Sequence, residues 1–83
     1  MTWFIVEYEN LTEKHNNKFV VFSETEEDAK WEIYETDECG WDGYVYLFCL
    51  GVYEGRTDDL KESCYYHWAD LEKDNYVARP RGF

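Results

Sequence analysis

The side chains of this chain that could do chemistry are mostly carboxylates, and they are concentrated in one segment. Residues 24–42 hold nine acidic side chains and a single basic one, Lys30. On a helix, Asp28, Glu32 and Glu35 would lie along one face at i, i+4 and i+7, where like charges repel by roughly 0.2–0.5 kcal/mol per pair. A chain that needed only solubility would place Lys or Arg among them. The pattern favours a surface that meets basic groups, and the alternative is a solvated acidic face.

Aromatic side chains adjoin these carboxylates. The chain contains four Trp, eight Tyr and five Phe, which is more than a core of this size can hold. Exposed Trp and Tyr beside charged groups are typical of the residues that contribute most to binding at interfaces. We therefore predict a partner-binding surface made of Glu24, Glu27, Asp28, Trp31, Glu32, Glu35, Asp37, Glu38, Trp41 and Asp42.

Cys64 and His67 are the other reactive pair in the sequence. Three residues apart on a helix, they would share a face, and a cysteine nucleophile needs such a nearby base. It also needs an electropositive setting that lowers its pKa, whereas the surrounding sequence is acidic. We expect a buried thiol beside an ordinary histidine, and no catalytic residues.

Metal and cofactor sites are not indicated. Zinc takes four ligands at organised spacing, which the three Cys and two His do not offer. The run at residues 37–42 lacks the D-x-D-x-D-G pattern of a calcium loop, and there is no glycine-rich phosphate-binding loop. We expect no metal, no cofactor and no enzymatic activity.

Composition narrows the class of partner. A chain of 83 residues predicts one domain, 1–83, with 76–83 as a partly flexible tail. The net charge of −11 argues against direct binding to nucleic acid or to an anionic membrane, and favours a larger basic protein. Three widely spaced cysteines without a C-x-x-C pair predict reduced thiols and a cytoplasmic location. We expect no signal peptide in MTWFIVEYEN and no membrane span.

The elements that must position the acidic surface begin with a hairpin. Alternating apolar residues predict a strand over 3–9 and a second over 18–23, joined by a polar loop at 10–17. After the second strand, the apolar residues recur at helical spacing, which predicts a helix over 25–37. Ser23 or Thr25 is its N-cap, and Gly40 ends it. Ala29 and Ile33 form its buried stripe, with Trp31 and Tyr34 as further candidates.

The second half of the chain opens with its most apolar segment. Residues 44–53 carry no charge and predict a strand covered on both faces, with Gly51 at a bulge or a close backbone approach. A second helix is predicted from Thr57 to about Lys73, because Leu60, Cys64, Trp68 (or His67) and Leu71 recur at helical spacing. A short edge strand is expected at 76–78.

The predicted fold class is therefore α+β with the order ββαβα. We expect a two-layer sandwich, in which a small antiparallel sheet of strand order 2-1-3 carries both helices on one face. The other face would present some of Trp3, Ile5, Tyr44 and Tyr46 as an exposed aromatic patch or a dimer seam.

In size, acidity and compact α/β organisation, the chain resembles the small acidic inhibitors encoded by phages, including anti-CRISPR proteins that mimic DNA. The resemblance is one of general character. It implies a protein that inhibits a nucleic-acid-binding enzyme or Cas effector in the host cytoplasm. The carboxylates that would stand in for phosphates are Glu24, Glu27, Asp28, Glu32, Glu35, Asp37 and Glu38. The alternative is a dimerising or adaptor domain that binds through the aromatic strand at 44–53, with its acids serving solubility.

Overall fold

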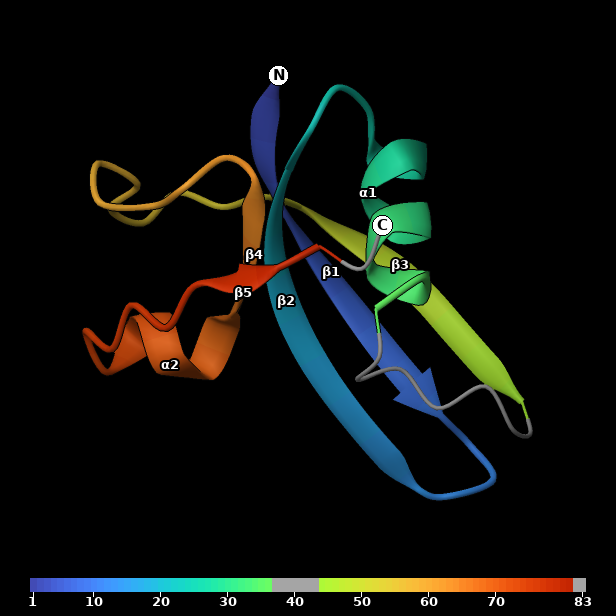
Figure 1. Cartoon of the computed structure of the whole chain (residues 1–83). Coiled ribbons are helices and arrows are strands. Elements are labelled where there is room, and N and C mark those ends of the chain that lie inside the picture. The colour runs from blue at the N-terminus through green and yellow to red at the C-terminus, as the bar shows by residue number, and fades with distance from the viewer. Residues whose placement is uncertain (37–43, 82–83) are drawn as a thin grey trace.

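The computed structural model of the protein describes residues 1–36 and 44–81 (Figure 1). Its elements, in chain order, are β1 (Thr2–Asn10), β2 (His15–Ser23), α1 (Glu26–Tyr34), β3 (Val45–Val52), β4 (Cys64–His67), α2 (Trp68–Glu72) and β5 (Arg79–Pro80). The strands form one antiparallel sheet in the order β3-β1-β2-β4-β5. The α+β class is confirmed.

The predicted N-terminal hairpin is confirmed, and its strands are longer than expected. β1 and β2 pair without interruption from Thr2 opposite Ser23 to Asn10 opposite His15. The buried Asn10 shortens the loop, because its side-chain Oδ1 accepts the backbone N–H groups of Thr12 (3.0 Å) and Glu13 (2.9 Å). This local capping of the turn leaves only residues 11–14 between the strands.

The first helix begins as predicted and ends early. The Thr25 hydroxyl caps it by accepting the N–H of Asp28 at 3.1 Å. Ala29 and Ile33 are fully buried against the sheet, as expected. α1 ends at Tyr34 rather than at residue 37, and Gly40, the predicted terminator, lies outside the described residues.

The second predicted helix is wrong over most of its length. Residues 64–67 form strand β4, and only residues 68–72 are helical. The sequence CYYH explains this, because a strand sends Tyr65 and Tyr66 to opposite faces, where each joins a different core cluster. The four residues of the predicted helical stripe do pack in one of these clusters, so the core membership is right and the element is wrong.

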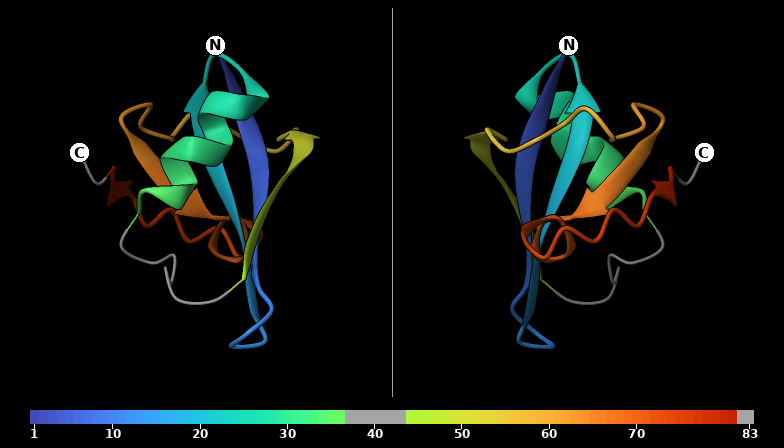
Figure 2. Two further views of the ribbon diagram at one scale, coloured as in Figure 1. Left: turned by 90° about the vertical axis from the view of Figure 1, so that its right-hand side faces the viewer. Right: turned by 90° about the vertical axis from the view of Figure 1, so that its left-hand side faces the viewer.

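The arrangement of the sheet and helices also differs from the prediction. The predicted neighbours 2-1-3 are present as β2, β1 and β3, but β2 is not an edge strand, because it pairs with β4. The complete sheet therefore has five strands and a different order. The helices lie on opposite faces (Figure 2). α1 covers the cluster around Val6 and Phe19, whereas Leu71 of α2 and Leu60 pack on the other side against Val20. The shortening of the second helix accounts for this, since α2 directly follows β4 and covers only the sheet face beside it.

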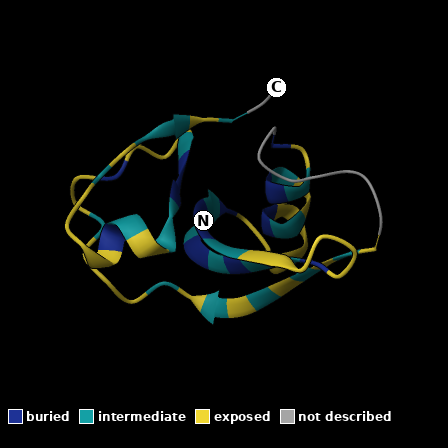
Figure 3. Cartoon of the chain, turned by 90° about the horizontal axis from the view of Figure 1, so that it is seen from below, coloured by how far each residue is buried: buried dark blue, intermediate teal, exposed yellow. Residues whose placement is uncertain are grey.

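The two edges of the sheet are built differently. β3 forms one edge, and Figure 3 shows its residues alternating between partly buried and exposed along the strand. The other edge is β5, two residues long and located at 79–80 rather than at the predicted 76–78. A bulge interrupts β3 near its end, where Ile5 pairs with Gly51 and Val6 with Cys49. The predicted bulge is thereby confirmed, and Gly51 has a φ of +121°, which L side chains rarely adopt.

Candidate functional site

Half of the predicted partner-binding residues surround one hollow beside α1. The hollow has a volume of about 370 Å³. Its lining combines the start of the chain, the end of β2 and one face of the helix, namely Met1, Ser23, Glu24, Asp28, Trp31, Glu32 and Glu35. The helical spacing anticipated in the sequence is therefore realised, and we call these residues the acidic face.

Trp31 is the apolar part of the acidic face. Its side chain is 57% exposed, although it belongs to a helix whose Ala29 and Ile33 are completely buried. The indole packs edge-on against Tyr34, with 5.7 Å between the ring centroids. An exposed Trp among carboxylates offers a partner both apolar area and a ring on which a cation can stack.

The carboxylates of the acidic face are not equivalent. Glu24, Asp28 and Glu35 are exposed, whereas Glu32 is largely enclosed and bound to groups of the same chain. Its Oε1 lies 2.9 Å from the Arg81 guanidinium, and its Oε2 accepts a hydrogen bond from the Ser23 hydroxyl. Glu32 is thus part of the fold rather than a group available to a partner.

Arg81 binds three elements at once. Besides Glu32, its guanidinium donates to the backbone carbonyl of Phe22 and, at 2.7 Å, to that of Glu62. The sequence offered one hint of this contact, since the last eight residues hold two Arg and no side-chain acid. Its partners, 19 to 59 residues away along the chain, were not predictable from spacing. The network shows how a guanidinium sits against α1.

Glu27 is a predicted acid that does not line this hollow. It pairs with Lys30, one turn along, at 2.9 Å between Oε2 and Nζ. Both line a groove of about 320 Å³ between the helix and strand β3, together with Trp31, Tyr34, Val45 and Leu47. Glu27 therefore lines this α1–β3 groove, which shares Trp31 with the hollow. Asp37, Glu38, Trp41 and Asp42 lie outside the described residues.

The uncharged strand presents a second surface that the sequence only partly indicated. The exposed large side chains of this segment are Tyr44, Tyr46, Phe48, Leu50 and Val52. Tyr46 and Phe48 stack with their rings nearly parallel, 6.1 Å apart and at 11°. Of the expected patch, Tyr44 and Tyr46 are exposed, whereas Trp3 is buried beside Phe22 and Tyr66. The prediction that this strand is covered on both faces is wrong.

Cys64 and His67 do not come together. They lie at opposite ends of β4, and their three-residue separation sends them to opposite sheet faces. Cys64 packs in the cluster beside Leu60, while the His67 ring lies 4.9 Å from Phe19. The helical face that was to bring them together is absent, because this segment is a strand. Cys49 and Cys64 are both free thiols.

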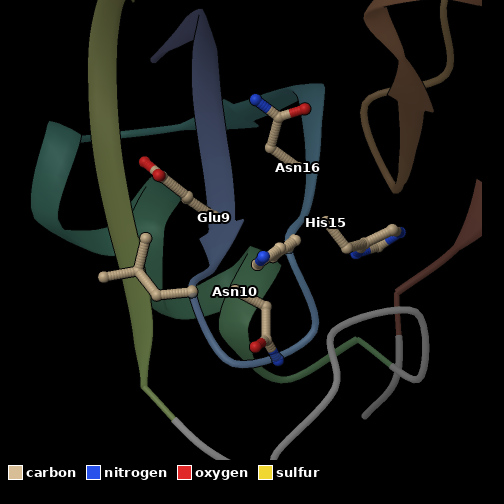
Figure 4. A pocket seen from close by; sticks show the side chains of 6 residues that line it. Glu9, Asn10, His15 and Asn16 are labelled. Carbon is tan, nitrogen blue, oxygen red and sulfur yellow. The ribbon is translucent and has the colours of Figure 1, made fainter.

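A further pocket lies at the tip of the first hairpin, lined by residues 9–11 and 14–16. Figure 4 shows Glu9 and His15 pointing away from each other across the hairpin. The Asn10 side chain is engaged by the turn and by the Tyr8 hydroxyl, at 3.3 Å. The polar groups here stabilise the hairpin and do not converge on the space between them.

Residues 1–36 and 44–81 hold no group of three or more His, Cys, Asp or Glu side chains that could bind a metal ion. Neither α1 nor α2 has the length and apolar character needed to cross a membrane.

No protein-family model, no curated protein and no solved structure matches this chain.

Proposed function

We propose that the protein is an acidic interaction domain that binds a basic, nucleic-acid-binding protein and inhibits it by occupying the surface that contacts phosphates. The observation that carries the proposal is the acidic face, where exposed carboxylates surround an exposed Trp on a single helix. Lys and Arg side chains of a partner would meet the carboxylates, and Trp31 would supply the desolvated contact. Such a partner is a nucleic-acid-handling enzyme, of which a Cas effector is one example.

Electrostatics support this class of partner. With a net charge of −11, the domain attracts basic surfaces over a distance set by ionic strength, and it repels polyanions. Arg81 gives an internal precedent, because a guanidinium already rests against Glu32 on the flank of the hollow.

The test is a comparison of two charge-reversed variants with the same net charge. The first, Glu24→Lys/Asp28→Lys/Glu35→Lys, changes the acidic face and leaves the structural Glu32 intact. The control, Asp58→Lys/Asp59→Lys/Glu72→Lys, changes three exposed acids away from this face and from strand β3. Each variant and the wild type are used to capture proteins from lysate at low salt, and the bound proteins are eluted with a salt step and identified.

We expect the wild type and the control variant to capture the same nucleic-acid-binding protein, and the acidic-face variant to lose it. Added duplex DNA should compete with the domain for that protein, and binding should weaken steeply as salt rises. Equal capture by both variants, or a captured protein that keeps its hold on DNA when the domain binds, would overturn the proposal.

A further inference from the structure

We propose that the β3 edge takes up an extended segment of a partner protein as an additional strand, lying along the groove between α1 and β3. The segment has an apolar centre and basic residues at both ends. Its basic character rests on the proposed function, whereas the site itself rests on the geometry of the sheet. This mode of binding adds backbone hydrogen bonds to an existing sheet, and side-chain pockets select the sequence.

The first argument is that β3 offers a row of backbone groups to a new strand. It is the last strand of the sheet and pairs only with β1 in the part of the chain that the structure describes. The Leu11 N–H donates to the Tyr44 carbonyl at 2.9 Å, which fixes which residues of β3 turn toward β1. The N–H and C=O groups of successive residues point to opposite sides of a strand. Those of Val45, Leu47 and Cys49 therefore point away from β1, toward the open side of the sheet.

The second argument is that this edge, before its bulge, lacks the charge and proline by which sheets avoid unwanted pairing. Edge strands are usually short or carry charge or proline. β5 meets this description with Arg79 and Pro80. By contrast, residues 44–53 contain no charged side chain and no proline, and they form the longest uncharged run of the chain. The bulge at Gly51 limits the regular edge to residues 45–49, which suits a short segment.

The third argument is that both faces of an added strand would find apolar partners. Side chains on one face would enter the α1–β3 groove beside Trp31 and Leu47. Side chains on the other face would lie next to the stacked rings of Tyr46 and Phe48. A helix alongside an open edge strand therefore leaves room for alternate residues of one extended segment.

Charge selects the occupant. Exposed carboxylates follow both ends of the uncharged strand. Glu13 is next in the hairpin loop to Thr12, whose hydroxyl accepts the Tyr44 N–H, and Glu54 comes just after Tyr53. Glu9 lies directly opposite Tyr46 on β1. A segment with Lys or Arg flanking an apolar centre complements this arrangement. A second copy of the chain would instead bring together two molecules of net charge −11.

The test uses a synthetic peptide, Lys-Lys-Val-Thr-Val-Thr-Val-Lys-Lys, and amide hydrogen exchange followed by NMR. In the free protein, we expect the amides of Val45, Leu47 and Cys49 to exchange fast and those of Tyr46 and Phe48 slowly. Saturating peptide should slow exchange at the first three by at least about tenfold, because their N–H groups become hydrogen-bonded. Exchange at Tyr46 and Phe48 should change little.

Two controls make the result specific. A peptide with proline in place of the central Val and the Thr after it keeps the charge but lacks an N–H on each side of the strand, so it should give no protection. The variant Phe48→Lys should bind the original peptide at least about fivefold more weakly than Val77→Lys, which makes the same charge change at another exposed apolar residue.

The outcomes separate this inference from the proposed function. Peptide binding without protection of the three outward amides, or no binding at millimolar peptide, overturns the inference and leaves the acidic-face experiment unaffected. Protection that is already present in the free protein and grows with its concentration, together with a dimer in sedimentation, also overturns it, since the occupant is then a second copy. Protection by the peptide supports the inference even where the acidic-face variant still captures its target.

Discussion

The two edges of the sheet treat the unpaired backbone groups of an edge strand in opposite ways. The β5 edge is two residues long, contains Pro80 and is followed at once by Arg81, whose guanidinium binds β2, α1 and the segment before β4. The β3 edge has eight residues, no charged side chain and a row of exposed aromatic and aliphatic groups. We call them the closed edge and the open edge. One sheet therefore ends in a structural network on one side and in an accessible surface on the other.

The comparison shows where this small domain depends on single contacts. The closed edge is held by a few specific polar groups, so one substitution there should be costly. The open edge contributes side chains that remain in water, so substitutions there should leave stability nearly unchanged and alter binding instead. The following predictions test this contrast.

The largest effect is expected for Arg81→Ala. This change removes three charge-assisted hydrogen bonds and leaves Glu32 as a partly buried carboxylate without its cation. Hydrogen bonds to charged groups contribute roughly 1.5–3 kcal/mol each, but the contacts are coupled, so we expect a total loss of about 2–3 kcal/mol. Urea unfolding measures it. Arg56→Ala, which breaks the exposed pair with Asp59, is the control and should cost less than about 0.5 kcal/mol.

A result in which Arg81→Ala and Arg56→Ala cost the same would show that the closed edge is not held by the guanidinium. Arg81→Lys adds a second check. Lysine keeps the charge but lacks the planar fork that reaches several acceptors, so it should recover only a minor part of the loss.

A smaller effect is expected for Tyr66→Phe in β4, beside the closed edge. The Tyr66 ring is fully buried, and its hydroxyl accepts the backbone N–H of Lys61 at 2.8 Å. Losing this bond should lower the free energy of unfolding by about 1 kcal/mol. Tyr46→Phe on the open edge removes an equivalent hydroxyl from an exposed ring and should change stability by less than about 0.3 kcal/mol. Equal losses in urea unfolding would contradict the contrast.

Phe48→Lys, on the open edge, should change the free energy of unfolding by no more than about 0.5 kcal/mol, because the ring is already 45% exposed. The same urea experiment tests this. A loss above about 1.5 kcal/mol would mean that the stack with Tyr46 belongs to the core, and the open edge would then be a structural surface.

The sequence predicted local elements better than their long-range arrangement. The hairpin, the Thr25 cap and the bulge at Gly51 follow from alternation, capping chemistry and backbone freedom, which act between near neighbours. The stripe from Leu60 to Leu71 fitted a helical period but is divided among a loop, β4 and α2. Apolar residues at helical spacing can equally reach one cluster through different elements, so their period does not fix the element.

For the acidic face, too, the local part could be predicted and the long-range contacts could not. The spacing of Asp28, Trp31 and Glu35 indicated a common face, because helical geometry alone places them. The ion pair of Glu32 with Arg81 could not be predicted, since it depends on how distant segments pack, whereas the pair of Glu27 with Lys30 is local to the helix. The edge position of β3 follows from the predicted order 2-1-3, whereas its exposed face was not predicted, because the strand was expected to be covered on both faces.

The smallest effect is expected at Tyr53, where the chain leaves the open edge. Its ring packs against the core cluster that contains Leu60 and Tyr66. Burial, followed by the negative charge of Glu72 and then the neighbouring Tyr76 and Asp74, raises the pKa of the Tyr53 hydroxyl above its usual value of 10.0. In the unfolded chain the hydroxyl loses its proton near pH 10, so between that pH and the folded pKa the unfolded state binds fewer protons. Stability should therefore be unaffected by this group below about pH 9 and should fall as pH rises through 10 toward the folded pKa. Urea midpoints measured at several pH values should decline less steeply in Tyr53→Phe than in the wild type. Parallel declines would mean that Tyr53 is as accessible as the tyrosines of the open edge, and that the chain is not anchored where it leaves β3.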